Sequence, residues 1–445
     1  MVEEQDVRAA EELIGFIQAC PSMFHTTRTI AERLDAAGFT RLAEGDAWEL
    51  APGGRYYTTR NGSSVIAFKV GERAAVPERY HFQVTASHGD SPTFKLKALP
   101  VIEGPDGMLR LDVEAYGGMI DYTWFDRPLS IAGRVLVETG GRVESRLIAP
   151  DRDLAMIPSL AIHLDRGMND GFSPNRATDV VPLVSAGELT AEGFDALIAR
   201  EAGVAPEQVL ARDLFLVSRV PARVWGAERE FVSSPKLDDL MCAFTSLKAF
   251  LAAENPASVN IYCCFDNEEV GSNTKQGAMS TFLPDTLTRL TGALGLTPED
   301  YRRALARSMM VSCDNAHALH PNKADKYDGL NRCHLNGGIV IKEAANQHYC
   351  TDAFSRAVFI AVCRRAGVSF QTFANRSDMA GGSTLGNLSN MQASMHAIDV
   401  GCAQLAMHSS YETAGTRDVA QVASALKAFL EADLAIEGAE SVELG

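Results

Sequence analysis

The sequence predicts an α/β protein in which a β-rich segment interrupts an α/β domain. Strand-like and helical stretches alternate along residues 1–92 and again along residues 233–445. The intervening residues 93–232 consist mostly of short strand-like runs broken by glycine and proline. Alternation of this kind is typical of a sheet that packs helices on its faces. We therefore expect one domain from residues 1–92 and 233–445, and a β-rich domain from residues 93–232.

The first ninety residues predict two helices followed by two strands. Apolar residues at helical spacing predict helices over 7–20 and 27–37, with Gly38 as the stop and residues 20–25 as the loop between them. Strands are expected over 64–70 and 80–86. The second strand leads into Ser87-His88-Gly89-Asp90.

The middle segment predicts mainly strands, and the second half returns to helices and strands. In the middle we expect strands over 109–114, 129–138 and 143–148, and a helix over 191–200. A helix beginning at Pro235-Lys236-Leu237-Asp238 should reach about residue 253. Beyond it, strands are expected over 259–265, 308–313, 338–342, 370–374 and 397–400, and helices over 284–291, 298–307, 351–366 and 417–432.

Composition excludes several classes of protein. The net charge of −16, without a visible Lys/Arg stripe, argues against nucleic-acid binding. Nine scattered cysteines without a Cys-x-x-Cys pair indicate reduced thiols and a cytoplasmic location. The N-terminus lacks the basic-then-apolar order of a signal peptide, and no apolar run is long enough to span a membrane.

Two adjacent glutamates, Glu268 and Glu269, follow the apolar run 259–265. The carboxyl ends of strands are where open α/β sheets bind ligands. Neighbouring carboxylates repel each other unless a cation or a proton lies between them. One glutamate can thus ligate a metal while the other handles a proton. The alternative is a solvated acidic turn.

Other histidines and carboxylates also follow predicted strands or begin a helix. Together they form a set of nitrogen and oxygen donors that suits two divalent ions such as Zn²⁺, Mn²⁺ or Co²⁺. A short aspartate is a suitable bridge between two ions, and Asp90 is placed to orient an imidazole two residues earlier. Individually, each residue also has a structural interpretation as a buried histidine, a helix-start aspartate or a turn residue. The set is His88, Asp238, Glu268, Glu269, Asp314 and His408.

Five motifs resemble the M18 metallopeptidases, the aspartyl aminopeptidase family, and its bacterial branch most of all. They occur in the family's order, and weaker matches between them extend the similarity over almost the whole chain. The motifs are Ser87-His88-Gly89-Asp90-Ser91-Pro92, Pro235-Lys236-Leu237-Asp238-Asp239-Leu240, Asp266-Asn267-Glu268-Glu269-Val270-Gly271-Ser272, Asp314-x-Ala316-His317-Ala318-x-His320-Pro321-Asn322 and Leu405-Ala406-Met407-His408-Ser409.

The resemblance implies a zinc-peptidase-like α/β/α catalytic domain interrupted by a β-rich dimerisation domain. It also implies release of an N-terminal residue, Asp or Glu, from peptides, and assembly into a homo-oligomer, typically a dodecamer. It implies two metal ions, with zinc as the first choice, held by His88, Asp238, Glu269, Asp314 and His408, with Asp238 bridging the two ions. It implies Glu268 as the general base and Asp90 as the residue that orients His88. It also implies that His163 reaches a neighbouring subunit's site and that Lys342 and Tyr349 contact the substrate.

Two departures and several alternatives stand beside this interpretation. The family usually has Asn where Asp239 stands, and it often has an arginine soon after the Met-His-Ser motif, where this chain has Ser409-Ser410-Tyr411-Glu412. A preference for neutral N-terminal residues is therefore one alternative. A di-metal carboxypeptidase or deacylase, a cysteine hydrolase and a non-enzymatic assembly protein are the others.

Overall fold

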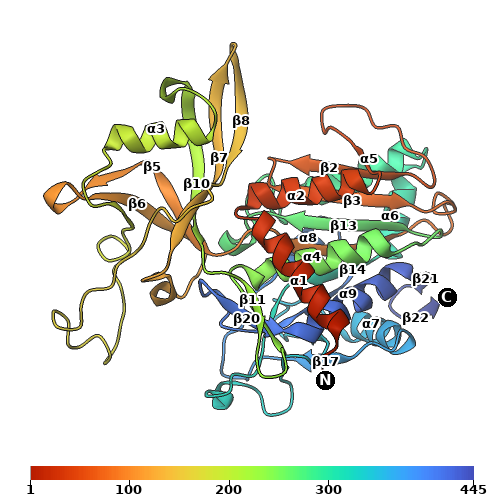
Figure 1. The fold of residues 1–445 in the computed structure, drawn as a ribbon. Helices are drawn as coiled ribbons and strands as arrows, with labels where there is room; N and C mark the ends of the chain where they lie inside the picture. The colour runs from red at the N-terminus through yellow and green to blue at the C-terminus, as the bar shows by residue number, and fades with distance from the viewer. Residues whose placement is uncertain (1) are drawn as a thin grey trace.

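A nine-stranded mixed sheet forms the centre of the computed structural model, which describes residues 2–445 (Figure 1). Strands β13, β4, β14 and β18 are parallel neighbours, so their carboxyl ends meet at one edge of the sheet. In spatial order the strands are β1 (Thr40–Arg41), β2 (Arg55–Arg60), β3 (Ser64–Val70), β13 (Val259–Phe265), β4 (Phe82–His88), β14 (Met309–Cys313), β18 (His396–Gly401), β16 (Ile339–Lys342) and β17 (Phe370–Phe373).

Helices cover both faces of this sheet, which gives the expected α/β/α layering. Two separate apolar cores lie between the sheet and the helices. The first core packs against α1 (Glu4–Ala19), α2 (Met23–Ala36), α4 (Leu237–Ala252), α7 (Ala353–Arg365) and α9 (Thr416–Glu431). The second packs against α5 (Phe282–Ala293), α6 (Pro298–Ala306) and α8 (Leu385–Gln392).

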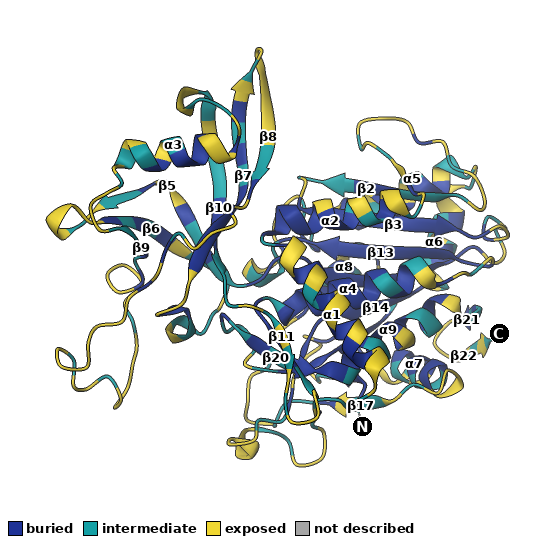
Figure 2. Ribbon diagram, viewed as in Figure 1, coloured by how far each residue is buried: buried dark blue, intermediate teal, exposed yellow. Residues whose placement is uncertain are grey.

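The central strands are buried on both faces, which explains their continuous apolar sequences. In β3, Val65 and Ala67 belong to the first core, and Ile66 and Phe68 belong to the second. All seven residues of β3, β4 and β13 are buried (Figure 2). Two-residue periodicity therefore directs alternate side chains into opposite cores.

A second, six-stranded sheet stands apart from the first and has its own apolar core (Figure 1). Helix α3 (Ala191–Glu201) packs on it, and its strands all lie within the predicted β-rich segment. In spatial order they are β8 (Arg142–Ile148), β7 (Leu129–Thr139), β10 (Val209–Ser218), β5 (Thr93–Glu103), β6 (Leu109–Tyr116) and β9 (Leu183–Ser185), with η1 (Pro105–Gly107), η2 (Asp121–Trp124) and η3 (Pro206–Gln208) between them.

A five-stranded third sheet joins the end of the middle segment to the C-terminal half. It places β11 (Arg223–Trp225) and β12 (Phe231–Ser234) beside β20 (Glu412–Gly415), β19 (Ala403–Leu405) and β15 (Ala316–His317). Both β11 and β12 thus pair outside the six-stranded sheet, and β12 runs across residues 232/233. The domain division at residues 92/93 and 232/233 stays a prediction. The remaining elements are η4 (Glu268–Val270), η5 (Ala324–Lys326) and the terminal hairpin β21 (Leu434–Glu437) and β22 (Ser441–Leu444).

Most predicted elements are confirmed, with differences at their ends. Helix α2 begins at Met23, directly after Ser22, so the prediction of a loop over residues 20–25 was wrong for its last three residues. His88 is the last residue of β4, two residues beyond the predicted end of that strand. Within residues 2–445, no helix combines the length and apolar character needed to cross a bilayer.

Candidate metal centre

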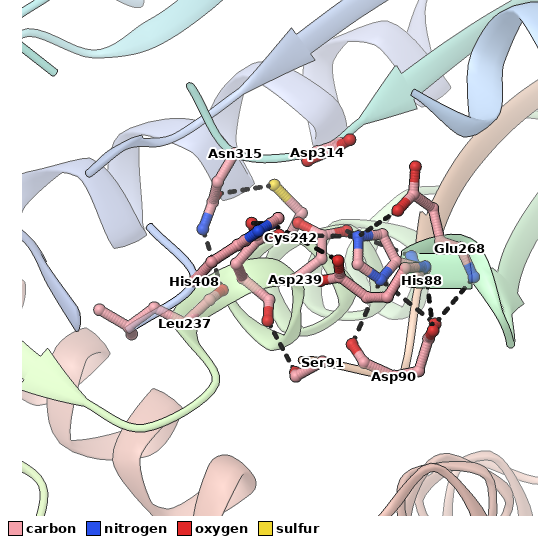
Figure 3. Close-up of polar contacts among 12 residues, drawn as sticks. His88, Asp90, Ser91, Leu237, Asp239, Cys242, Glu268, Asp314, Asn315 and His408 are labelled. Atoms are coloured by element: carbon pink, nitrogen blue, oxygen red, sulfur yellow. Dashed lines mark hydrogen bonds and ion pairs between the residues drawn. The ribbon is translucent and has the colours of Figure 1, made fainter. Parts of the chain in front are cut away.

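The predicted ligands converge from five separate places in the chain at one edge of the large sheet (Figure 3). His88 ends β4, and Asp314 directly follows β14. Glu268 and Glu269 begin η4 after β13, Asp238 lies in the first turn of α4, and His408 lies in the turn between β19 and β20. The parallel pairing of β13, β4 and β14 brings the first three of these places together.

The Asp238 carboxylate lies between the two imidazoles. Its Oδ1 is 3.6 Å from His88 Nε2, and its Oδ2 is 3.4 Å from His408 Nε2. His88, Asp238 and Asp314 belong to one compact group of potential ligand atoms, and Asp238, Glu269 and His408 form another. Each oxygen of Asp238 thus faces a different histidine, which is the arrangement that a bridging carboxylate requires.

Several carboxylate oxygens in this cluster are buried without a hydrogen-bond partner. They are Asp238 Oδ1, Asp239 Oδ1 and Glu269 Oε1. Leaving a buried carboxylate unpaired is costly, and a divalent cation removes that cost. The donor set of two imidazoles and several carboxylates, with no thiolate, suits zinc. The residues present therefore fit a metal centre.

Asp239 was noted in the sequence as a departure from the family pattern. It is fully buried, and its Oδ2 accepts a hydrogen bond from the His88 backbone N–H at 3.1 Å. It also belongs to the group that contains His88, Asp238 and Asp314. The extra carboxylate therefore adds negative charge directly beside one histidine.

Asp90 touches both His88 and the turn that carries the two glutamates. Its Oδ1 is 3.4 Å from His88 Nδ1, and the backbone oxygen of Asp90 is 3.2 Å from the same nitrogen. Its two carboxylate oxygens accept hydrogen bonds from the backbone amides of Glu268 and Glu269, both at 3.2 Å. The i, i+2 spacing seen in the sequence thus brings Asp90 to His88.

Glu268 is the more exposed glutamate of the pair, and its surroundings shift its pKa upward. Burial raises its pKa to about 8; the positive charge of His88 opposes this shift, and the negative charges of Asp314 and Asp90 reinforce it. Glu268 Oε2 is 4.0 Å from His88 Nε2, and its side chain keeps 15% of its surface exposed. It is therefore accessible, whereas Glu269 beside it is 4% exposed at the side chain.

Glu412 was missed by the sequence analysis, although it supports two of the ligands. Its buried carboxylate accepts hydrogen bonds from the backbone N–H of Asp238 at 2.9 Å and of His408 at 2.7 Å. Burial raises the pKa of Glu412 to about 8, and the charge of Asp238 adds to the shift. The sequence offered no signal because Glu412 and Asp238 lie 174 positions apart in the chain.

Lys342 is buried beside Asp314, which is a predicted ligand, and Tyr349, which is a predicted substrate contact. Its Nζ donates to the backbone oxygens of Asp314 at 2.8 Å and Asn315 at 3.2 Å, and lies 3.9 Å from Asp314 Oδ2. The Tyr349 ring centroid is 5.0 Å from the same nitrogen. Lys342 and Tyr349 are therefore close to the cluster.

His163 lies away from the cluster within its own chain. It is exposed on the long loop between β8 and β9, which extends from the six-stranded sheet (Figure 2). Within residues 2–445, none of the groups of potential metal-ligand atoms includes His163. It is the one predicted site residue that the fold of a single chain does not bring to the others.

The fold and the cluster together define a metallohydrolase, with histidine and carboxylate ligands at the carboxyl ends of the strands of an α/β sheet. The family model for the aminopeptidase I zinc metalloproteases (M18) matches residues 16–430. The chain belongs to the M18 family of aminopeptidases, and it is a metallo-aminopeptidase.

Relatives and solved structures agree with this assignment. A probable M18 family aminopeptidase 2 of Clostridium acetobutylicum is 41% identical over 434 residues, which cover 96% of this chain and 99% of that protein. A chain in the cryo-EM structure of the Ape4 and Nbr1 complex is 35% identical with a TM-score of 0.92, covering 97% and 87% of the two chains. A chain of the S. cerevisiae mApe1 dodecamer is 29% identical with a TM-score of 0.83, and the match covers 94% of this chain and 95% of that chain.

Proposed function

We propose that this aminopeptidase uses two metal ions and Glu268 to release N-terminal Asp or Glu from peptides. The observation that carries the two-metal part is the Asp238 carboxylate, whose two oxygens face His88 and His408 separately. Asp314 completes the group around His88, and Glu269 completes the group around His408. Zinc is the proposed metal, with manganese or cobalt as alternatives.

Metal ions in this centre would supply an activated water and would polarise the scissile carbonyl. Glu268 would take the proton of the attacking water and deliver it to the leaving amine, because it is the more exposed glutamate of the pair. Asp90 would hold His88 through Nδ1 and fix its orientation. Tyr349, or His163 from a neighbouring subunit, would donate to the developing oxyanion.

Substituting each glutamate separately tests this division of labour. Glu268→Gln should retain metal and lose about 10²–10⁴-fold in kcat, because a general base contributes roughly that much. Glu269→Gln should lose metal as well as turnover. Elemental analysis beside steady-state kinetics distinguishes the two variants. Equal metal loss in both would refute the assignment of Glu268 as base.

The preference for acidic residues is supported by Lys342. An ammonium group has three N–H donors, and Lys342 uses two of them on the backbone oxygens of Asp314 and Asn315. One donor therefore remains for a substrate carboxylate, and such a charge-assisted bond favours Asp or Glu over an apolar side chain.

A panel of peptides with N-terminal Asp, Glu, Ala and Leu tests the preference directly. The wild-type enzyme should show the highest kcat/KM on the acidic peptides. Lys342→Met should lower the ratio of Asp-peptide to Leu-peptide turnover. Both enzymes should be assayed at saturating metal, since Lys342 also contacts Asp314. A wild-type preference for Leu-peptides would overturn the acidic specificity and leave the metal chemistry intact.

Assembly into a homo-oligomer, a dodecamer in this proposal, is supported by the loop that carries His163. Apolar side chains on it are exposed in the single chain, including Leu160, Ile162 and Leu164, which is 75% exposed. Exposed apolar groups at this density are typical of a protein–protein contact. The similar mApe1 forms a dodecamer. We therefore propose that the loop reaches a second copy of the chain, where His163 enters the active site.

The alternative of a cysteine hydrolase is not favoured by the thiols. Burial raises the pKa of Cys263 and Cys264 well above the ordinary value, and both side chains are buried in the large sheet. A thiol in such surroundings is a poor nucleophile. The cytoplasmic location that we propose is supported by the nine cysteines, all of which are free thiols.

A further inference from the structure

A short segment of the β-rich part of the chain lies against both groups of proposed metal ligands. It comprises residues 116–120, which connect the end of β6 to η2, and we call it the bridging segment. Strand β6 belongs to the six-stranded sheet, whereas His88 belongs to the nine-stranded sheet and His408 lies in the turn between β19 and β20 of the third sheet. The bridging segment therefore connects the two parts of the molecule at the metal centre.

Tyr116 is the contact of this segment on the His88 side. Its hydroxyl donates to Asp90 Oδ2 at 2.8 Å and accepts from Asn267 Nδ2 at 2.8 Å. Burial, followed by the charges of Asp90 and Asp266, raises the pKa of Tyr116 well above its ordinary value, so the hydroxyl remains a donor. The carboxylate that it holds is the one that contacts His88 Nδ1.

Gly118 and Ile120 are the contacts on the His408 side. The backbone oxygen of Gly118 accepts from His408 Nδ1, because a carbonyl can only accept. The backbone N–H of Ile120 donates to the His408 backbone oxygen at 3.0 Å. With Nδ1 engaged, His408 Nε2 faces Asp238 and Glu269, 3.4 and 3.5 Å away.

Gly117 allows the close approach between these two contacts. Its φ of +82° favours glycine, and a Cβ there would lie 3.1 Å from Glu269 Cβ. The segment therefore rests directly on a third proposed ligand.

We propose that the bridging segment positions both histidine ligands, with Tyr116 acting as a positioning residue for His88 through Asp90. This inference rests on the two-metal function proposed above. Outer groups that hold a ligating histidine typically change metal affinity by about ten- to a hundredfold. The placement of the six-stranded sheet against the large sheet thereby controls metal binding, in addition to any role in assembly.

Cobalt titration of the full chain, stripped of metal, tests the proposal with Tyr116→Phe. Calorimetry measures the affinity and visible absorption reports the ligand geometry of bound Co²⁺. Tyr116→Phe should bind one of two ions about ten- to a hundredfold more weakly and change the spectrum. The variant should fold, because its ring keeps the edge-to-face contact with Phe215, whose centroid is 5.5 Å away.

Tyr57→Phe is the matched control. Tyr57 is buried and donates to Asp35 Oδ1 at 2.8 Å, the same kind and length of bond as that of Tyr116 with Asp90. Asp35 lies in α2, however, and not beside a proposed ligand as Asp90 does. Tyr57→Phe should bind Co²⁺ as the wild type does. Gly117→Ala is a second test of the bridging segment and should weaken the binding of the ion beside Glu269.

The outcomes separate this inference from the proposed function. If the wild type binds two Co²⁺ ions and both Tyr116→Phe and Gly117→Ala match it in affinity and spectrum, the bridging segment has no positioning role. If Tyr57→Phe weakens binding as much as Tyr116→Phe, the effect is general and the proposal is also wrong. A wild type that binds fewer than two ions would overturn the two-metal function itself.

Discussion

At the scale of single residues, the metal centre is a concentration of buried negative charge. Burial raises the pKa of Glu269 and Asp239 well above their ordinary values, and neighbouring carboxylates add to the shift at Glu269. A cation placed among these groups stabilises their charged forms and displaces protons. Metal binding should therefore weaken as pH falls, because protons compete for the same carboxylates and imidazoles.

Glu412 provides a prediction at this scale, because it contacts two proposed ligands and belongs to none of the groups of potential ligand atoms within residues 2–445. Glu412→Ala removes the acceptor for the backbone N–H groups of Asp238 and His408. We expect metal affinity to fall by about ten- to a hundredfold, as measured by competition with a chromogenic chelator.

Asp418 is the matched control for Glu412. It is also a buried carboxylate that accepts from two backbone N–H groups, those of Asn336 at 2.6 Å and Gly338 at 2.9 Å, but these partners are not proposed ligands. Asp418→Ala should lower Tm without changing the metal affinity of the folded protein. If both variants lose affinity equally, Glu412 has only a general structural role.

At the scale of elements, the close approach of β18 to the turn after β14 fixes the position of Asp314. The Asp314 backbone N–H donates to the Val400 oxygen at 3.0 Å. At the next residue, Gly401, a Cβ would lie 1.8 Å from the Asp314 backbone oxygen. That oxygen also accepts from Lys342 Nζ. Only glycine at position 401 leaves room for the Asp314 backbone and for its contact with Lys342.

Gly401→Ala should therefore displace Asp314 and reduce metal content, and overpacking should lower stability by about 1–3 kcal/mol. Elemental analysis and thermal unfolding measure the two effects. Gly292→Ala is the control, since Gly292 is exposed in α5 and a Cβ there has nothing within 4 Å. It should raise helix stability by roughly 0.5–1 kcal/mol and leave the metal unchanged. Normal metal content in Gly401→Ala would show that the site can shift to accept the extra methyl.

At the scale of the whole molecule, the exposed loop between β8 and β9 separates His163 from the site of its own chain. If His163 serves a neighbouring subunit, two inactive parents should complement each other. The parents are His163→Phe and Glu268→Gln. Dissociation, mixing and reassembly should restore part of the activity, because some sites then combine a wild-type Glu268 with a neighbour's wild-type His163.

Each parent, taken through the same dissociation and reassembly alone, is the control. Co-assembly must be verified by size and by differential tagging. A mixture that is no more active than the sum of its parents would count against a shared active site.

The sequence by itself determined the class of fold and most of its strands and helices, and it predicted which residues would gather in the candidate metal centre. It could do so because two-residue and 3.6-residue periodicities are local, and because His88, Glu268 and Glu269 are at or near the ends of recognisable strands. It also indicated the β-rich middle from its composition.

Only the tertiary structure decided which groups support those residues. Tyr116, Gly118 and Glu412 act through contacts with partners 26, 290 and 174 residues away in the chain, and two of the three involve backbone atoms, which carry no sequence signal. The short strands of the third sheet escaped prediction because strands of two to four residues have too few positions to show a period. Long-range packing, rather than local preference, therefore places the groups that support the proposed metal ligands.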